Sequence, residues 1–299
     1  MNQPNLFRRS SLAWLAGLVV FSGVATATRA SNEPGQIAIS PSRFEVTIGS
    51  RPTTESVTVL NLGKKDVTIA VSTATWDLDP ENRIRILEPD EQSLDQWMVI
   101  NPLRFTVAAG KSQTVRFSIR PRVQPEDGEH RAMIYFNQVL PELSEQPVRV
   151  KFSIGVAVYG FAGDVTRFGK LHNVELVEGA NPMLARLDVS SDGSAHVRLQ
   201  GQYAIYAADQ YPGADKTTLL ADFNGDRSKL PDSVITAGTL PARPILPSTR
   251  RELFLKTPRE LPPGRYVLDL NGTLAGESID LAIPFTVSEK TLVAESTPE

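Results

Sequence analysis

Residues 54–71, with the sequence TESVTVLNLGKKDVTIAV, decide the fold class of this 299-residue chain. Apolar and polar residues alternate in 54–60 and again in 67–71, and the polar run Asn-Leu-Gly-Lys-Lys at 61–65 separates them. A period of two places every second side chain on the same face of a β-strand. The stretch therefore predicts two consecutive strands, each with one buried face, connected by a polar turn.

The same alternation recurs along the chain between clusters of Gly, Pro, Asn and Asp, whereas helical periodicity is scarce. Further strands are expected at 103–107, 114–119, 132–136, 148–158, 184–189, 196–206, 252–256, 266–270 and 278–287. Short strands at this spacing are typical of an immunoglobulin-like β-sandwich. The sequence therefore predicts an all-β protein with two such sandwiches.

Turn residues predict three hairpins. The first joins 103–107 to 114–119 through Ala109-Gly110-Lys111, and the second joins 184–189 to 196–206 through Ser191-Asp192-Gly193. The third has Asn271-Gly272 between two alternating runs, which is the strongest short-range hairpin signal.

The alternation breaks at 160–169, where glycine becomes frequent. We place the junction there, which predicts domains at 31–160 and 161–288 and a polar tail at 289–299.

The N-terminus has the features of a signal peptide. Arg8 and Arg9 precede an apolar run at 12–24, and small residues follow at 25–27 and again at 28–30. Residues 1–30 are therefore expected to be cleaved after export by the general secretory route. An uncleaved anchor or the twin-arginine route are the alternatives. No later stretch is apolar enough to cross a bilayer, so no membrane span is expected in the mature chain.

Composition excludes several functions. A net charge of −3 and a pI near 5.8, with no basic stripe, argue against nucleic-acid binding. The chain has no cysteine, so its stability must come from apolar cores rather than from disulfides. Nothing predicts an enzyme: no phosphate-binding loop is present, and Ser194, near His196, lacks the glycine of a nucleophile elbow. We interpret this pair as a turn serine beside a surface histidine.

No metal or other cofactor is expected. The three histidines, at 130, 172 and 196, do not have the spacing of metal ligands. The run at 222–226 resembles the start of a calcium loop, but Arg227 stands where glycine is needed and Ser233 where glutamate is needed. A polar turn is the preferred interpretation.

One strand is unusually long. Apolar residues alternate without a break through 148–158, about 35 Å at 3.3 Å per residue, whereas most strands have about five or six residues. The apolar residues are Val148, Val150, Phe152, Ile154, Val156 and Val158. Either this strand covers its own core, or it is an edge strand that completes the sheet of another protein.

The first half resembles the N-terminal domain of PapD-like periplasmic chaperones, which assemble pili. The similar motifs are the opening strand IAISPSRF (37–44), VTVLNLG (57–63), WMVINPLRF (97–105), AGKSQTVR (109–116), IYFN (134–137) and the strand at 148–158. The resemblance spans residues 36–160. The second half fits only as a second, longer immunoglobulin-like domain.

The resemblance implies two sandwiches in an angled, boomerang arrangement and a periplasmic chaperone without enzymatic activity. Its partners would be subunits of a pilus or surface fibre and an outer-membrane usher. It would cap a subunit by donating a strand that carries Val148, Val150, Phe152, Ile154 and Val156. In such a strand, Phe152 and Ile154 should be largely exposed in the free protein, or covered only by self-association. The alternative is a structural or adhesive protein of the fibre itself.

The resemblance also implies a site for the subunit's C-terminal carboxylate. Arg43 falls at the position of the arginine that holds this group, and a guanidinium can bind a carboxylate through two hydrogen bonds. The family's lysine position falls on Ala157, so this chain departs from the pattern there.

Overall fold

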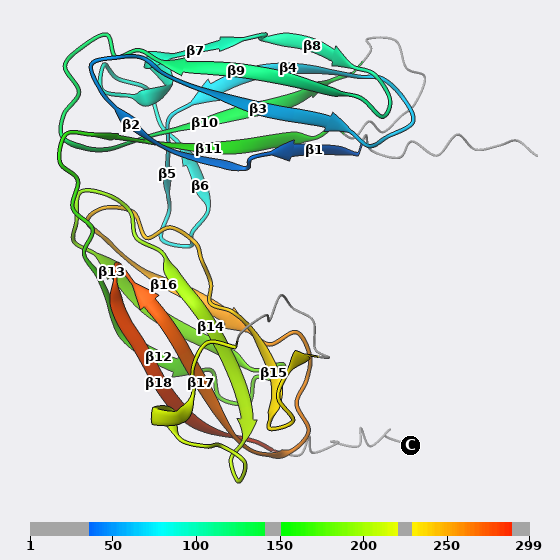
Figure 1. The fold of residues 1–299 in the computed structure, drawn as a ribbon, viewed down its shortest axis with the longest axis vertical. Coiled ribbons are helices and arrows are strands. Elements are labelled where there is room, and N and C mark those ends of the chain that lie inside the picture. Colours follow the sequence, from blue (N-terminus) through cyan, green and yellow to red (C-terminus); the bar gives the residue numbers. More distant parts are fainter. Residues whose placement is uncertain (1–35, 141–150, 221–228, 289–299) are drawn as a thin grey trace, which may run out of the picture. The chain divides into compact units, whose positions relative to one another are not determined.

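The structure is a computed structural model that describes residues 36–140, 151–220 and 229–288, all within one compact unit. These residues form β-strands and two short 3₁₀ helices, η1 (Leu94–Trp97) and η2 (Ala214–Lys216) (Figure 1). Among them, no helix has the length and apolar character needed to cross a membrane.

The first sandwich has two sheets, with strand orders β1-β3-β9-β7 and β2-β11-β10-β4-β8, and a separate β5–β6 hairpin. Its strands are β1 (Ile37–Ser40), β2 (Arg43–Ile48), β3 (Thr53–Asn61), β4 (Val67–Ala74), β5 (Trp76–Leu78), β6 (Ile84–Ile86), β7 (Met98–Asn101), β8 (Arg104–Val107), β9 (Ser112–Ile119), β10 (Gly128–Val139) and β11 (Ser153–Ala162).

The second sandwich has sheets of order β12-β13-β16 and β15-β14-β17-β18. Its strands are β12 (Gly169–Leu176), β13 (Leu184–Ser191), β14 (Leu199–Ala207), β15 (Val234–Thr239), β16 (Thr249–Lys256), β17 (Gly264–Leu274) and β18 (Glu277–Val287). The predicted all-β fold with two sandwiches is confirmed.

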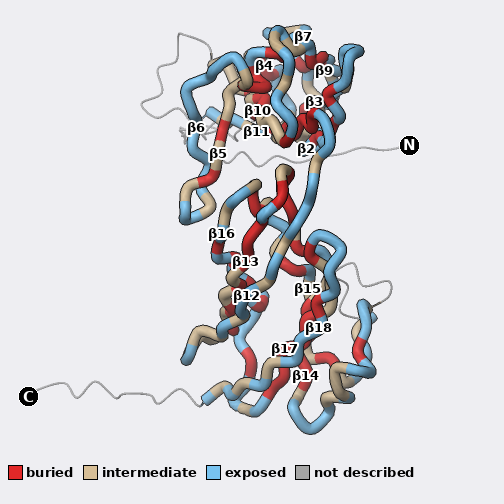
Figure 2. Tube along the Cα trace, turned by 90° about the vertical axis from the view of Figure 1, so that its left-hand side faces the viewer, coloured by how far each residue is buried: buried red, intermediate tan, exposed pale blue. Residues whose placement is uncertain are grey.

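Alternation decides which side chains fill each core. On β3, Val57 and Val59 are fully buried while Ser56 and Thr58, which alternate with them, are exposed. Figure 2 shows the buried residues along the strands of both sandwiches and the exposed residues mainly in the connections. Removing apolar surface from water in this way is the main favourable term in folding.

Asn61 fixes the turn after β3. Its buried amide donates hydrogen bonds to the carbonyls of Lys65 (2.8 Å) and Val107 (3.0 Å), and its Oδ1 accepts one from the Gly63 amide (2.9 Å). A buried polar side chain is tolerated because all these partners are present.

Two predicted hairpins are wrong. β8 pairs with β4 whereas β9 pairs with β3 and β7, and β13 pairs with β12 and β16 whereas β14 pairs with β15 and β17. The turns exist, but each carries the chain from one sheet to the facing one. Both strands beside such a turn still bury one face in the shared core, so their alternation is the same as in a hairpin.

The third hairpin forms between β17 and β18, but its turn is not at Asn271-Gly272. Both residues lie inside β17, where Gly272 pairs with Gly201 of β14. The chain turns at Ala275 and Gly276, which have φ angles of 53° and 90°. The sequence analysis also did not predict β5, β6, β12 or β15. The expected signal peptide and the tail at 289–299 lie outside the described residues.

Candidate functional site

The first half of β11 has an open edge. Along one side, β11 pairs with β10 from Ser153↔Asn137 to Ala162↔Gly128. Along the other side, the parallel strand β2 pairs with it only from Ala157↔Arg43 onward (Figure 1). Among the described residues, no strand pairs with 153–156 on that side. The edge is open because the preceding strand, β1, belongs to the opposite sheet, where it pairs with β3.

The burial of the alternating apolar residues increases along β11. Val156 and Val158 are fully buried in the core of the first sandwich, so Val156 contributes to the protein's own core. Phe152 and Ile154 are half-buried rather than largely exposed, and Phe152 packs against that core. Val148 and Val150 lie outside the described residues. The part of the row beside the open edge is therefore its half-buried part.

Arg43 begins β2, at the point where β2 closes the edge of β11. Its partner in the register is Ala157, so the two side chains lie on the same face of the sheet. The Arg43 Nε lies 3.3 Å from Oε1 of Glu45, and both side chains are substantially exposed, at 48% and 38%. An exposed ion pair of this kind contributes only about 0–1 kcal/mol to stability.

A buried carboxylate joins this face to the second sandwich. Glu129 of β10 accepts hydrogen bonds from the backbone amide of His196 (2.7 Å), from His196 Nδ1 (2.6 Å) and from Arg131 NH1 (3.1 Å). The Glu129 side chain is fully buried, and that of His196 is 3% exposed. His196 was expected at the surface, and this expectation is wrong because Tyr159 and Phe161 of β11 lie against its ring.

The pKa of Glu129 is lowered. Burial alone would raise it, but the hydrogen bonds and the charge interaction from His196, together with the positive charge of Arg131, outweigh burial. The carboxylate therefore contributes stability above about pH 4.5, its value in the unfolded chain, and this contribution is lost as the pH falls through the lower folded value.

We expect the free energy of unfolding to fall less steeply below about pH 4.5 in Glu129→Gln than in the native protein, because the neutral amide does not titrate. Urea melts over a pH series measure this slope. Glu88→Gln, at an exposed position, serves as the control and should keep the native slope. Parallel curves for all three proteins would contradict the assignment to Glu129.

Arg198 lies over the ring of Tyr159, with its guanidinium carbon 5.4 Å from the ring centre. Its three nitrogens donate to the Tyr159 hydroxyl (3.0 Å), to His196 Nε2 (3.2 Å) and to the carbonyl of Ala242 (2.8 Å). Because an arginine can only donate, His196 Nε2 must be the acceptor, so Nδ1 carries the proton that is shared with Glu129.

Apolar contacts surround this polar network. One buried cluster consists of Trp76, Leu78, Met133, Tyr159, Phe161, Ala195 and Leu246. It combines the β5–β6 hairpin and the outer face of β10 and β11 with two segments of the second sandwich. Burial of Tyr159 raises the pKa of its hydroxyl, and the nearby charges of Arg198 and Arg43 act in the opposite direction.

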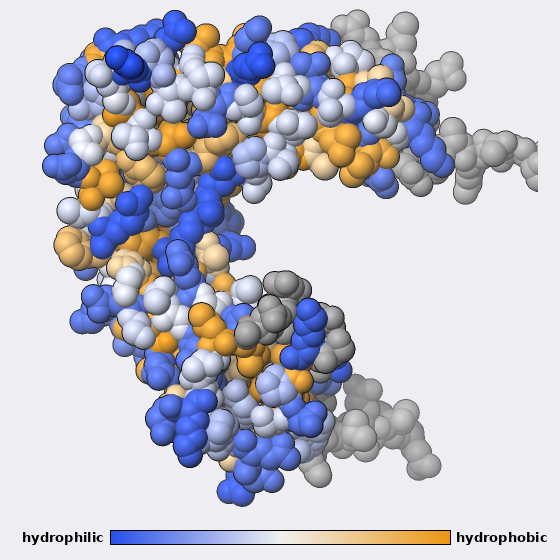
Figure 3. All heavy atoms as spheres, in the orientation of Figure 1, coloured by the Kyte–Doolittle hydropathy of each residue, from blue (hydrophilic) through white to orange (hydrophobic). Residues whose placement is uncertain are grey.

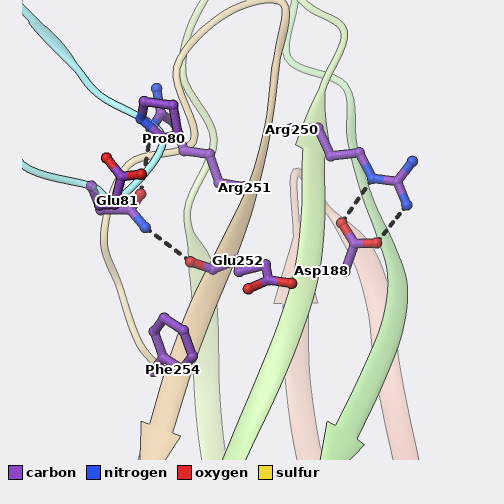
Figure 4. A pocket seen from close by; sticks show the side chains of 8 residues that line it. Pro80, Glu81, Asp188, Arg250, Arg251, Glu252 and Phe254 are labelled. Carbon is purple, nitrogen blue, oxygen red and sulfur yellow. Dashed lines mark hydrogen bonds and ion pairs between the residues drawn. The ribbon is translucent and has the colours of Figure 1, made fainter.

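A hollow of about 500 Å³ lies where the β5–β6 hairpin meets β16. Arg251 donates there to the carbonyls of Asp79 (2.6 Å) and Leu78 (3.0 Å), and Asn82 donates to the carbonyl of Glu252 (2.9 Å). Figure 4 shows the ion pair of Arg250 and Asp188 on one side of this hollow and Phe254 on the other. These hydrogen bonds hold the hairpin against β16, and among the described residues the buried Nε of Arg251 has no hydrogen-bond partner.

The other candidate sites were the metal and calcium sites. Among residues 36–140, 151–220 and 229–288, no three metal-ligating side chains cluster. The calcium-like run at 222–226 lies outside these ranges. On the face that Figure 3 shows, hydrophobic residues appear as small separate patches between hydrophilic ones.

Sequence reasoning proposed Arg43 and the apolar row as site residues, which stays a prediction. It did not single out Glu129, Tyr159 or Arg198, and it assigned His196 to the surface. The only sequence signal for them was the polar run at 192–196, which gives no indication of its contact with β10.

No protein-family model matches the sequence, and no curated protein matches it. Solved structures do. The chaperone–tip adhesion subunit pre-assembly complex CsuC–CsuE from archaic chaperone-usher Csu pili of Acinetobacter baumannii matches with 13% identity and a TM-score of 0.43, over 85% of this chain and 100% of that chain. The Salmonella enterica SafA pilin–SafB chaperone complex matches with 10% identity and a TM-score of 0.42, over 86% and 99%. The E. coli chaperone DraB matches with 13% identity and a TM-score of 0.41, over 86% and 98%. In structure, the chain is similar to chaperones of pili and fimbriae, the class of protein that its first half resembles in sequence.

Proposed function

We propose that this protein is a periplasmic chaperone that captures a subunit of a pilus or surface fibre by strand pairing at β11. The observation that carries the proposal is the open edge at 153–156 on a strand that is paired on both sides from Ala157 onward. An unpaired strand edge is a template for a strand of another chain, and native proteins usually cover or charge such edges. Here the strands of the described residues leave the edge open beside half-buried apolar side chains.

Both backbone and side chains contribute to capture in this proposal. The client's edge strand pairs with the backbone of 153–156, and the client's open core receives Phe152 and Ile154, together with Val148 and Val150. Each apolar side chain that becomes fully buried contributes about 1.5–3 kcal/mol. Several together offset the cost of association, about 4–15 kcal/mol. Val156 supports this strand from inside its own sandwich.

The point where β2 begins defines the end of the docked strand. A client strand on the open edge cannot extend beyond Ala157, because β2 occupies the same side of β11 from Arg43 onward. The terminal group of the strand therefore meets the guanidinium of Arg43. A carboxylate suits this cation, so the client strand runs parallel to β11 with its C-terminus at Arg43. An outer-membrane usher would receive the complex.

We expect Ile154→Asp to reduce subunit capture at least tenfold, because a charge replaces an apolar group that enters the client's core. Its own fold should lose less than about 2 kcal/mol, since Ile154 is half-buried at an edge. Co-purification with a co-expressed pilus or surface-fibre subunit measures capture, and denaturant melts measure stability.

Ser153→Asp is the matched control, because Ser153 is exposed on the opposite face of the same strand. It should retain both capture and stability. Undiminished capture by Ile154→Asp would overturn strand pairing at this edge.

A further inference from the structure

The exposed carboxylate of Glu45 lies within a cluster of positive and polar groups. Its Oε1 is 3.3 Å from Arg43 Nε and 3.6 Å from His196 Nε2, and His196 Nε2 is 3.2 Å from Arg198 Nε. These three successive contacts lead from Arg43 on β2 to Arg198, which comes from the second sandwich. The Arg43 guanidinium therefore contacts Glu45 directly, and the Arg198 guanidinium is connected to Glu45 through His196 Nε2.

Glu45 is weakly held there. Since Nε2 of His196 accepts a hydrogen bond from Arg198, it presents no proton to Glu45, and the contact at 3.6 Å is not a hydrogen bond. The remaining contact is the exposed ion pair with Arg43. A pair of this kind is screened by solvent and exchanges readily with a competing anion.

Arg198 donates its hydrogen bonds to groups other than carboxylates. Its hydrogen bonds run to a phenol, an imidazole and a backbone carbonyl, so within these contacts its positive charge is not balanced by a carboxylate. The side chain is half-buried, which leaves part of the guanidinium accessible. A partly desolvated cation attracts an anion more strongly than one in bulk water does.

We propose that Glu45 is an internal placeholder for the client's C-terminal carboxylate, and that Arg198 is the second cation of this carboxylate site. The inference rests on the proposed function, which brings a chain terminus to Arg43. On docking, the client carboxylate replaces Glu45 at Arg43 and gains the charge of Arg198, while Glu45 turns to solvent. The second cation thus comes from Arg198, whereas Ala157 stands at the position where the resemblance implies a lysine. The bound carboxylate interacts with both sandwiches at once.

Titration with acetate tests the carboxylate site in the absence of a client strand. In the native protein, titration with acetate should shift the Nε–H NMR resonances of Arg43 and Arg198 to saturation. In Glu45→Gln, half-saturation should need at least threefold less acetate, because the competing carboxylate is gone. Glu277→Gln, at an exposed position at the start of β18, should behave as the native protein. An unchanged or higher half-saturation in Glu45→Gln, or no shift at Arg198, would overturn the proposal.

A strand peptide separates this inference from the proposed function. The probe is a nine-residue peptide of alternating Val and Thr, made with a free C-terminal carboxylate and as the C-terminal amide. Arg198→Gln should weaken binding of the acid at least fivefold and leave the amide unchanged, whereas Arg104→Gln, on the distant strand β8, should change neither. Equal effects of Arg198→Gln on both peptides would refute the role of Arg198 while strand capture stands. Acetate shifts at both arginines without binding of either peptide would contradict strand capture while the carboxylate site stands.

Discussion

Glu129→Ala should lower the free energy of unfolding by about 3–5 kcal/mol, the usual cost of removing one partner from a buried charged pair. The substitution leaves the backbone amide of His196 and the guanidinium of Arg131 without the acceptor that both now share. It also removes the proton acceptor of His196 Nδ1, so the orientation of the imidazole that holds Arg198 is lost.

Denaturant melts monitored by far-UV circular dichroism measure this loss. Glu88→Ala, at an exposed position, should stay within about 0.5 kcal/mol of the native protein. A loss in Glu129→Ala no larger than that of Glu88→Ala would show that the buried network contributes little to stability.

Gly272→Ala should destabilise the second sandwich by more than about 3 kcal/mol. A Cβ atom at this position would lie 2.1 Å from the carbonyl oxygen of Gln200, which belongs to the backbone of the paired strand β14. A backbone atom cannot rotate away as a flexible side chain can, so β14 and β17 would have to separate.

Gly276→Ala is the informative comparison for thermal or urea melts. Gly276 has a φ of 90° but nothing within 4 Å of the added Cβ, so only conformational strain is expected, about 1 kcal/mol. If both variants lost the same free energy, close strand approach would not be the reason for glycine at position 272.

These two glycines show what turn chemistry can and cannot predict. Asn271-Gly272 has the composition of a tight turn, yet Gly272 is needed for close approach to a neighbouring strand, and Ala275 makes the turn together with Gly276. The period-two pattern predicted the strands because burial of one face depends on local sequence. It did not distinguish a hairpin from a connection between facing sheets, since both bury alternate residues in the same core.

In the candidate site, too, local sequence predicts some features while others depend on packing between distant segments. Alternation alone placed Phe152, Ile154 and Val156 on one face, but the depth to which each is buried depends on where β2 joins the sheet. Glu129 and His196 are 67 positions apart in the chain, and the sequence around each of them does not predict the contact. Contacts at such separation follow from the packing of two sandwiches, which the pattern of one chain does not specify.

On the proposed function, the start of β2 beside β11 affects the timing of capture during export. A client strand that ends at Arg43 would be accepted only when the client offers a free chain terminus, and the C-terminus is the last part of a polypeptide to leave the translocation channel. The chaperone would therefore bind the finished subunit. A fragment cut short would bring different side chains to Phe152 and Ile154, so the same stop also serves as a check on completeness.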